Sequence, residues 1–466
     1  MSAPRLTLHD IEAFERWTPF ARPFRFGAVT VDGAMQAFVR LVVEVEGHGR
    51  AVGAAAELMP PKWFDKRPDR SPADTVADLG ASLGQAVASA ADMPPRRTAS
   101  ARHAAHYAAQ ADWGHRADLT ALSSGFGVAL IDKAVLDGLA RALGVGFLPL
   151  LAANGVGLDA RLTPDLDQQA IDQRLARLAS QSSIAIRHTV GLADPLDGPD
   201  GLAGEIAANA LRFFKIKLGG DPAVDHDRLV AIAAILDGPG FDYVVTVDAN
   251  EQYGAASLAD LFGRLEADMR LTRLIASLAL VEQPYDRRVT FEAALAPAIA
   301  ARTVIIDEAD EDYEAFPRAL ALGYRGVSSK SCKGLYKALL NGVRVMVANA
   351  GGGVRHVLSA EDLTCQAGLA VQQDTALVAA MGLAHVERNG HHYVDGFGLA
   401  PAGEAEAFLA AHPALYHREA GAVRLATATG RLATSTLFET VGFASGAMPD
   451  WTSLNRLTLR TEGLPA

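Results

Sequence analysis

The chain has 466 residues, of which 50% are hydrophobic and 21% charged, with 43 glycines and 22 prolines; this composition is that of a globular protein and excludes disordered and collagen-like chains. The formal net charge of −11 argues against a nucleic-acid partner. The two cysteines, Cys332 and Cys365, exclude a disulfide framework and a zinc site made of cysteines alone.

The N-terminal region predicts an α+β domain. Its first 17 residues are polar and lack the apolar core of a signal peptide, and nowhere in the chain do 18 apolar residues follow one another. Residues 34–47 and 49–58 alternate apolar and polar positions around Gly47-His48-Gly49, which predicts an antiparallel hairpin. Residues 68–124 and 124–146 have helical spacing, and the second stretch ends in glycine. We expect a cytoplasmic protein with no membrane span.

From about residue 180, short β-rich runs alternate with helical ones. Eight strands are expected, with the sequences IAIRHTV, FFKIKLG, YVVTVDAN, ALVEQP, TVIIDEA, GVSSK, HVLSAEDL and HVERNGHHYVDG. Alternation of this kind predicts βαβ units on a parallel sheet, and so many units in so short a stretch favour a closed (β/α)8-type barrel. A doubly wound open sheet is the alternative, although no G-x-G-x-x-G follows a strand.

The tail after about residue 400 is rich in alanine and glycine. Residues 422–432 suggest a strand pair within it. We expect three segments: an α+β capping domain at 1–150, the barrel at 151–400, and a C-terminal segment at 401–466 that packs back on the first domain.

The polar residues that close the predicted strands form a series. Lys215 and Lys217 lie two residues apart on one strand face, and such a face cannot pack as a barrel core unless carboxylates neutralise it. Carboxylates follow at the ends of the next three strands, about one βα unit apart. They are Asp248, with Asn250 on the same face, then Glu282, then Asp307 with Glu308.

This series favours a metal-assisted acid–base site. Clustered carboxylates repel one another unless they are protonated or bridged by a hard cation, and oxygen ligands suit Mg²⁺ or Mn²⁺ better than zinc. Lys330 ends the next strand, about halfway round the ring from Lys217, where a nearby metal can lower a lysine pKa toward that of a general base. Each residue alone has a structural explanation, as a solvated face or a cap. The ordered set of residues as a whole favours a catalytic site over these structural explanations.

The order of residues resembles the enolase superfamily, and within it the muconate cycloisomerase (muconate-lactonizing) subgroup, whose barrel carries Lys-x-Lys on the second strand and a single Lys on the sixth. The resemblance covers most of the chain, because VGAAAELMP resembles the family's capping sheet and residues 127–151 resemble the helix that runs into its barrel. It implies a modified TIM barrel with an N-terminal capping domain.

The resemblance also implies roles for the site residues. Asp248, Glu282 and Asp307 match the ligands of a Mg²⁺ ion that binds a substrate carboxylate whose α-proton is abstracted to give an enolate. Lys217 and Lys330 match the two acid–base lysines, and Lys215 matches their electrostatic helper. Supporting or substrate-binding roles are expected for Asn250, Glu308, Lys333, Glu361, Asp362 and Trp63.

The sequence departs from the family's pattern after the fifth strand. The sixth reads SSKSCKGL, so Lys333 competes with Lys330 for the catalytic position, which we assign to Lys330 because it lies at the strand end. The stretch 336–362 fits the family's spacing poorly. Either Glu361 or Asp362 supplies the carboxylate of the seventh strand, or Ser359 and Asp362 cap a helix.

The histidines have structural as well as functional interpretations. His188, on the first barrel strand, either faces the substrate or is structural. His391 and His392 resemble a surface turn more than ligands. The mandelate racemase and sugar-acid dehydratase subgroups pair a seventh-strand His with a sixth-strand Asp; His356 is nearby, but the sixth strand offers Lys330 and no Asp.

Specificity in this family comes from capping-domain loops. The candidates here are residues 22–26 and the segment 59–66, in which Trp63 and Phe64 offer an apolar lid and Lys62 an anion contact. A packed Trp63 is the structural alternative.

We therefore expect an enzyme, a Mg²⁺-dependent lyase or isomerase that acts on a small carboxylate substrate. It would be a cycloisomerase, an o-succinylbenzoate-synthase-like dehydratase, or an N-acylamino acid or dipeptide epimerase. The alternatives are a sugar-acid dehydratase and a catalytically silent barrel that acts as a binding protein. The resemblance further implies a homo-oligomer.

Overall fold

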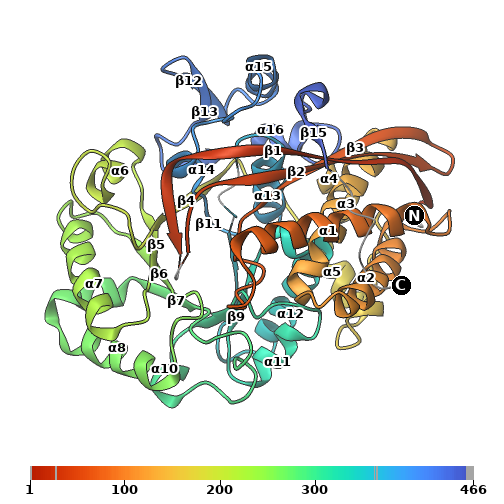
Figure 1. Ribbon diagram of the computed structural model, residues 1–466. Helices are drawn as coiled ribbons and strands as arrows, with labels where there is room; N and C mark the ends of the chain where they lie inside the picture. The colour runs from red at the N-terminus through yellow and green to blue at the C-terminus, as the bar shows by residue number, and fades with distance from the viewer. Residues whose placement is uncertain (1–2, 27–28, 362, 364–365, 458–466) are drawn as a thin grey trace.

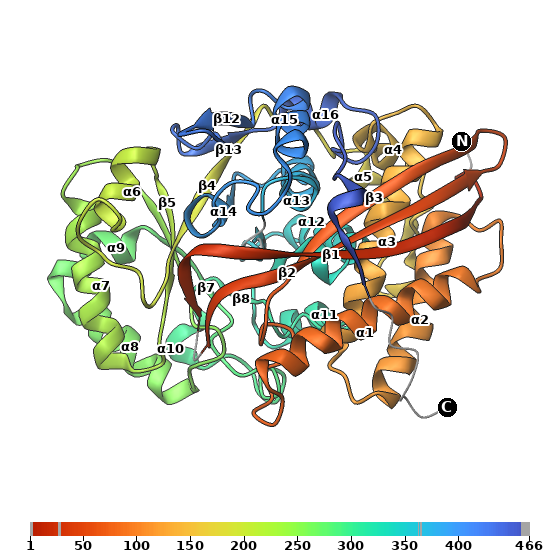
Figure 2. The same cartoon turned by 45° about the horizontal axis from the view of Figure 1, so that its top comes forward.

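The computed structural model describes residues 3–26, 29–361, 363 and 366–457. An antiparallel sheet backed by helices forms the N-terminal part, and a ring of parallel strands surrounded by helices forms most of the rest (Figures 1 and 2). The ring strands follow one another in chain order without a reversal. The predicted barrel with an α+β capping domain is therefore confirmed, and the alternative of a doubly wound open sheet is wrong.

The N-terminal sheet has the order β15-β1-β2-β3. Its long strands are β1 (Leu6–Phe26), β2 (Val29–Val45) and β3 (Gly49–Met59). The predicted hairpin is confirmed, because Val45 pairs with Gly49 around a turn in which Gly47 and Gly49 have φ of +79° and +86°. Strand β1 was not predicted. Register irregularities between His9 and Glu12 and between Pro19 and Phe24 break its alternation.

Helices α1 (Pro72–Ala91) and α3 (Ala121–Ala142) pack on this sheet, and α2 (Ala99–Arg116) packs on both of them. Helix α3 is buried along nearly its whole length and lies directly on β3. At Gly53, a Cβ atom would lie 2.0 Å from the carbonyl oxygen of Ala134, so glycine is required for this close approach. The helices α4 (Phe147–Ala152) and α5 (Gln168–Leu175) lead into the barrel.

The barrel strands run in parallel around a nearly closed ring. They are β4 (Ser183–Val190), β5 (Phe213–Lys217), β6 (Val244–Asp248), β7 (Leu278–Glu282), β8 (Val304–Ile306), β9 (Gly326–Ser329), β10 (Val357–Ala360) and β11 (His385–Glu387). The helices among and after them are α6 (Leu202–Asn209), α7 (Pro222–Asp237), α8 (Ala255–Ala267), α9 (Thr272–Ala276), α10 (Pro297–Ala300), α11 (Ala315–Ala321), α12 (Leu335–Ala350), α13 (Leu369–Ala380) and α14 (Gly390–Tyr393).

One seam of the ring is joined by a side chain. Among the described residues, β10 and β11 form no ladder with each other. The fully buried guanidinium of Arg187 lies between them and donates to Ser359 Oγ and to the carbonyl oxygen of Ala360, both at 2.9 Å, while its Nη1 lies 2.9 Å from Nδ1 of His385. Arg187 therefore links the first, seventh and eighth strands.

The C-terminal segment contacts both parts of the molecule. Its elements are α15 (Ala402–Ala411), β12 (Tyr416–Glu419), β13 (Ala422–Leu425), β14 (Arg431–Ala433), α16 (Ser435–Glu439) and β15 (Asn455–Arg456). The predicted strand pair within 422–432 is wrong, because β13 pairs with β12 and β14 joins barrel strand β4. Strand β15 pairs with β1, and Arg16 of β1 forms a buried bidentate ion pair with Glu404.

The described residues include no helix with both the length and the apolar character that a membrane crossing requires.

Candidate active site

Strand register places the charged side chains at one level of the barrel. Lys217 of β5 lies opposite Asp248 of β6, which in turn lies opposite Glu282 of β7. All three side chains are buried, and Lys217 Nζ donates to Asp248 Oδ2 at 2.5 Å. Because the carboxyl ends of parallel strands meet at one rim, the residues that end these strands come together there.

Lys215 lies among four buried carboxylates. Its Nζ is 2.9 Å from Asp248, 3.0 Å from Glu282 and 2.9 Å from Glu387, and it also contacts Glu361. Burial acts to lower the pKa of Lys215, but the carboxylates outweigh burial and hold the pKa well above its usual value. The ammonium is therefore the positive charge around which these acids gather.

The acids respond to this environment in different ways. Burial and the neighbouring Glu361 raise the pKa of Glu282 well above its usual value. At Glu361, burial acts in the same direction, but Lys215 and Lys330 outweigh it and hold the pKa well below the usual range. Positive charge thus stabilises the ionised form of Glu361 more than that of Glu282.

The residues present suit a hard divalent cation. One carboxylate oxygen from each of Asp248, Glu282 and Glu361 lies within 4.8 Å of the others, and all three residues are buried. Glu282 lacks a hydrogen bond of good geometry from the described residues, and its Oε2 has only the ion pair with Lys215 Nζ at 3.0 Å. Carboxylate oxygens are the ligands that Mg²⁺ takes in proteins, and here separate strands supply them. The group includes Glu361, whereas the sequence predicted Asp307 as the third ligand.

Asp307 is held by lysines. Its carboxylate accepts hydrogen bonds from Lys330 at 2.8 Å and from Lys333 at 3.1 Å. Lys333 also donates to the carbonyl oxygen of Ser328 at 2.7 Å and lies 3.3 Å from Asp310, and it is not among the residues that line the cavity described below. Lys330 does line it. Of the two candidates, Lys330 is the one that faces the cavity.

The protonation of Lys330 differs from the prediction for a general base. Burial acts to lower its pKa, but Asp307 and Glu361 outweigh burial and raise the pKa well above the usual value. Its Nζ also lies over the Trp63 ring, 5.0 Å from the centroid. In this arrangement Lys330 is an ammonium, which is the acid form of an acid–base pair.

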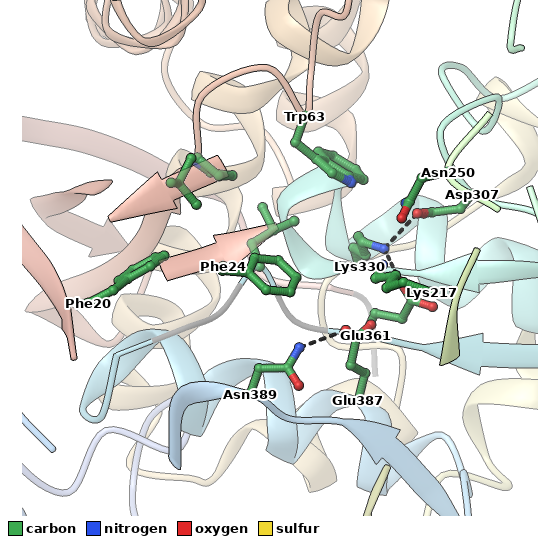
Figure 3. A pocket seen from close by; sticks show the side chains of 13 residues that line it. Phe20, Phe24, Trp63, Lys217, Asn250, Asp307, Lys330, Glu361, Glu387 and Asn389 are labelled. Atoms are coloured by element: carbon green, nitrogen blue, oxygen red, sulfur yellow. Dashed lines mark hydrogen bonds and ion pairs between the residues drawn. The ribbon is translucent and has the colours of Figure 1, made fainter. Parts of the chain in front are cut away.

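A cavity at the barrel mouth has one polar and one apolar side (Figure 3). The polar side consists of Lys217, Asn250, Asp307, Lys330, Glu361, Glu387 and Asn389. The apolar side consists of Phe20, Phe24, Val31, Pro60, Trp63 and Leu363. The volume is about 40 Å³, little more than that of a single water molecule, so part of the lining must move before a larger molecule can enter.

The loop after β3 brings the capping domain onto the barrel rim. Trp63 is buried and packs edge-on against Phe64, with ring centroids 4.8 Å apart. The predicted anion contact at Lys62 is wrong, because Lys62 Nζ donates to two carbonyl oxygens of its own loop at 2.6 and 2.9 Å. Lys66 reaches the barrel instead and lies 2.7 Å from Glu308 and 2.8 Å from Glu251.

The other predicted residues are placed as follows. Asn250 lines the cavity and donates through Nδ2 to Glu308 at 3.1 Å. Glu308 is not among the lining residues, so it supports Asn250 and does not face the cavity itself. Ser359 lies within β10, and the next helix begins at Leu369, so the alternative of a helix cap at Ser359 is wrong. Asp362 lies outside the described residues.

Sequence reasoning missed Phe20, Glu387 and Asn389. Glu387 ends the eighth strand just as the acids end theirs, which was a usable signal. It accepts a hydrogen bond from Thr189 at 2.5 Å and another from Asn389 at 2.7 Å. Phe20 gave no such signal, because only the folded hairpin brings it to the cavity.

His188 lies outside the cavity. Its neighbours Arg187 and Thr189 make contacts within the barrel, so His188 points outward on the alternating strand. It contacts His391 and His392, and His392 is only 6% exposed. The expectation of a surface turn at these two histidines is therefore wrong, and so is the interpretation that His188 faces the substrate.

Known proteins share this architecture. No family model matches the chain. A hydrophobic dipeptide epimerase from Citrifermentans bemidjiense is 27% identical over 350 residues, which cover 73% of this chain and 78% of that protein. A dipeptide epimerase from Enterococcus faecalis, complexed with Mg and L-Leu-L-Tyr, has a TM-score of 0.59 at 14% identity, and the match covers 94% of this chain and 99% of that one.

A muconate lactonizing enzyme from Pseudomonas fluorescens, complexed with muconolactone, has a TM-score of 0.58 at 16% identity, and the match covers 94% of this chain and 96% of that one. The solved structures show the shared fold. Together the comparisons confirm the predicted resemblance to the enolase superfamily and the prediction of an enzyme whose relatives are isomerases.

Proposed function

We propose that this enolase-superfamily enzyme is a Mg²⁺-dependent epimerase that moves the α-proton of a small carboxylate substrate between Lys217 and Lys330, and that its substrates are hydrophobic dipeptides. One observation carries the proposal: both lysines line the same cavity. They end β5 and follow β9, which lie four strands apart in a ring of eight, so they approach a bound substrate from opposite sides.

Asp248 and Glu282 would hold the metal, with Glu361 or Asp307 as a third ligand. Mg²⁺, when bound, supplies positive charge that stabilises the negative charge developing on the substrate carboxylate. Lys215 adds an ammonium at the same place, because it contacts Asp248 and Glu282 directly. The positive charge of the chain's own side chains thus stabilises the negative charge that the substrate carboxylate gains only as the α-proton leaves.

Epimerisation needs one base and one acid on opposite faces of the α-carbon. Lys217 would take the proton from one epimer as Lys330, in its ammonium form, delivers a proton to the other face; the reverse reaction exchanges these roles. A lysine on each side permits this transfer. A reaction that only removes a proton would need one of them.

The lining of the cavity supports the substrate class. Phe20, Phe24 and Trp63 offer an apolar wall for a hydrophobic side chain. Glu387 and Asn389 lie on the polar side of the cavity, where a carboxylate and an amide can receive a cationic or hydrogen-bonding group such as a peptide amine. The sequence similarity to a hydrophobic dipeptide epimerase points to the same class.

Proton NMR in D₂O with Mg²⁺ tests the proposal. We expect deuterium at one α-carbon of dipeptides such as L-Ala-L-Leu and the appearance of a second diastereomer. Lys217→Ala and Lys330→Ala should each lose epimerisation by about 10²–10⁴-fold, and each should retain exchange from at most one epimer. Lys62→Ala is the matched control, because Lys62 Nζ donates to two carbonyl oxygens of its own loop and does not line the cavity.

Other outcomes would replace the proposal. Conversion of a muconate-like acid without dipeptide exchange would indicate a cycloisomerase, and loss of water from an acid sugar would indicate a dehydratase. Mg²⁺ binding without exchange of any substrate proton would indicate a binding protein.

A further inference from the structure

A second cluster of metal-ligating side chains lies outside the barrel. His188 comes from β4, Glu205 from α6 and His391 from α14, so three segments far apart in the chain meet there. Both views place α14 beside β4, with α6 next to them (Figures 1 and 2). The outward direction of His188 separates this cluster from the carboxylates inside the ring.

The spacing of the cluster suits a tetrahedral ion. Nδ1 of His188 and Nε2 of His391 are 3.3 Å apart, and one ligand atom from each of the three residues lies within 4.8 Å of the others. Two nitrogens bound to one ion at about 2.0–2.1 Å with a tetrahedral angle are about 3.3–3.4 Å apart. The two imidazoles therefore already have the separation that ligation requires.

The chemistry of the set selects the kind of ion. Two imidazole nitrogens and one carboxylate favour Zn²⁺ and similar transition ions, whereas Mg²⁺ prefers oxygen ligands alone. Burial lowers the pKa of His391 to about 4, so its imidazole is neutral and has a lone pair to offer at neutral pH. The cluster is thus chemically distinct from the carboxylates of the barrel.

Neighbouring groups hold the carboxylate in place. Glu205 Oε1 lies 2.9 Å from Nδ1 of His392, and Glu205 Oε2 accepts a hydrogen bond from Asn209 at 3.0 Å. Arg22 of β1 lies 3.4 Å from Glu205, and its positive charge is offset by Asp200 at 2.8 Å. Outer contacts of this kind orient ligands in protein metal sites.

The cluster is accessible. A cavity of about 380 Å³ borders it and is lined by Arg22, Glu205 and His391, and also by His417. An ion can therefore reach the cluster without passing through the substrate cavity, whose lining shares none of these residues.

We propose that His188, Glu205 and His391 bind a Zn²⁺-type transition-metal ion at a site separate from the catalytic one. The site would fasten α14 to the first βα unit of the barrel. Asn389, which lines the substrate cavity, lies two residues before His391, and Arg22 lies on the strand that carries Phe20 and Phe24. A bound ion would thus steady two sides of the cavity mouth.

Metal titration tests the proposal. The full-length protein in excess Mg²⁺ is titrated with Co²⁺, whose visible absorption reports four-coordinate nitrogen and oxygen ligation, and with Zn²⁺ by calorimetry. We expect one equivalent to bind. His188→Gln and His391→Gln should each weaken it by about 10-fold or more, as in other sites that lose a ligand or its supporting group. His417→Gln, a variant of the same cavity, should bind like the wild type.

The result is independent of the proposed epimerase activity. If His188→Gln fails to fold, His391→Gln decides the test, because His391 is only partly buried. The alternative explanation of the 3.3 Å contact is a direct hydrogen bond between the two imidazoles. Absence of binding in excess Mg²⁺, or equal affinity in wild type and a folded His391→Gln variant, would establish that alternative and overturn the proposal.

Discussion

Replacing Lys215 tests the carboxylate cluster most directly. Its ammonium contacts Asp248, Glu282, Glu361 and Glu387, and Met at this position keeps the length of the side chain without the charge. We expect Lys215→Met to destabilise the metal-free protein strongly. Mg²⁺ should reverse much of the loss, because a bound cation restores positive charge among the same oxygens.

The contacts set the magnitude of this effect. Removing one partner of a buried ion pair costs about 3–5 kcal/mol. Two carboxylate oxygens at the 4.8 Å limit of the cluster repel each other by about 3–4 kcal/mol at an effective dielectric constant of 20, which agrees with that range. For a chain of this size, 1 kcal/mol corresponds to about 1–2 °C by extrapolation, so the apparent Tm in EDTA should fall by about 3–10 °C.

Thermal unfolding in EDTA and in excess Mg²⁺ measures the effect. The matched control is Lys133→Met, because Lys133 is also fully buried but pairs with Glu57 at 3.0 Å and with the carbonyl oxygen of Ala56 at 2.8 Å, and not with the carboxylates around Lys215. Lys133→Met should lower Tm equally in both conditions, whereas Lys215→Met should regain half or more of its loss in Mg²⁺. A Mg²⁺-induced rise no larger in Lys215→Met than in the wild type would refute the assignment of the metal to these carboxylates.

Three further predictions concern stability, substrate binding and pH. Glu404→Ala leaves the buried Arg16 without its carboxylate partner and should lower the free energy of unfolding, measured with denaturant, by about 3–5 kcal/mol. Glu406→Ala removes an exposed ion pair and should change the free energy of unfolding by less than about 1 kcal/mol. Trp63→Ala removes part of the apolar wall and should raise KM about 10-fold or more for dipeptides with apolar side chains, with less effect on those with polar ones. Burial lowers the pKa of His106 to about 4, so as the pH falls the unfolded chain protonates this imidazole before the folded chain does. The free energy of unfolding should therefore decrease by roughly 3 kcal/mol between pH 6.5 and 4. His106→Gln should make the pH dependence of the free energy of unfolding shallower in this range, and an unchanged slope would contradict the prediction.

The barrel could be predicted because each of its strands is a short apolar run followed by a helical stretch. The same logic failed at the edges of the fold. Strand β1 has two register irregularities that hide its alternation of apolar and polar residues. The sequence predicts that β14 pairs with the strand just before it in the chain, because its actual partner, β4, lies more than 200 residues away. Pairing over such a distance leaves no local signal.

The candidate site could be predicted as far as strand ends define it. Lys217, Lys330 and the acids of β6 and β7 close their strands, and register then brings them together. The position of Glu361 beside Asp248 and Glu282 depends on closure of the ring, which spacing along the chain cannot reveal. Phe20 reaches the cavity through the path of a long hairpin, and His188 could not be assigned because both faces of its strand are buried.

The seam at Arg187 has a consequence for how the ring opens. A backbone ladder separates only when several hydrogen bonds break together, but this seam is joined by side chains: the guanidinium of Arg187, whose planar set of donors fits a single geometry, and the ammonium of Lys215, which contacts both Glu361 and Glu387. A rotation of the Arg187 side chain would loosen the facing edges of β10 and β11 while the ladders between the other strands stay intact. Amide hydrogen exchange should therefore begin at these edges, at low free energy, and Arg187→Lys should hasten it there ahead of any change elsewhere in the ring.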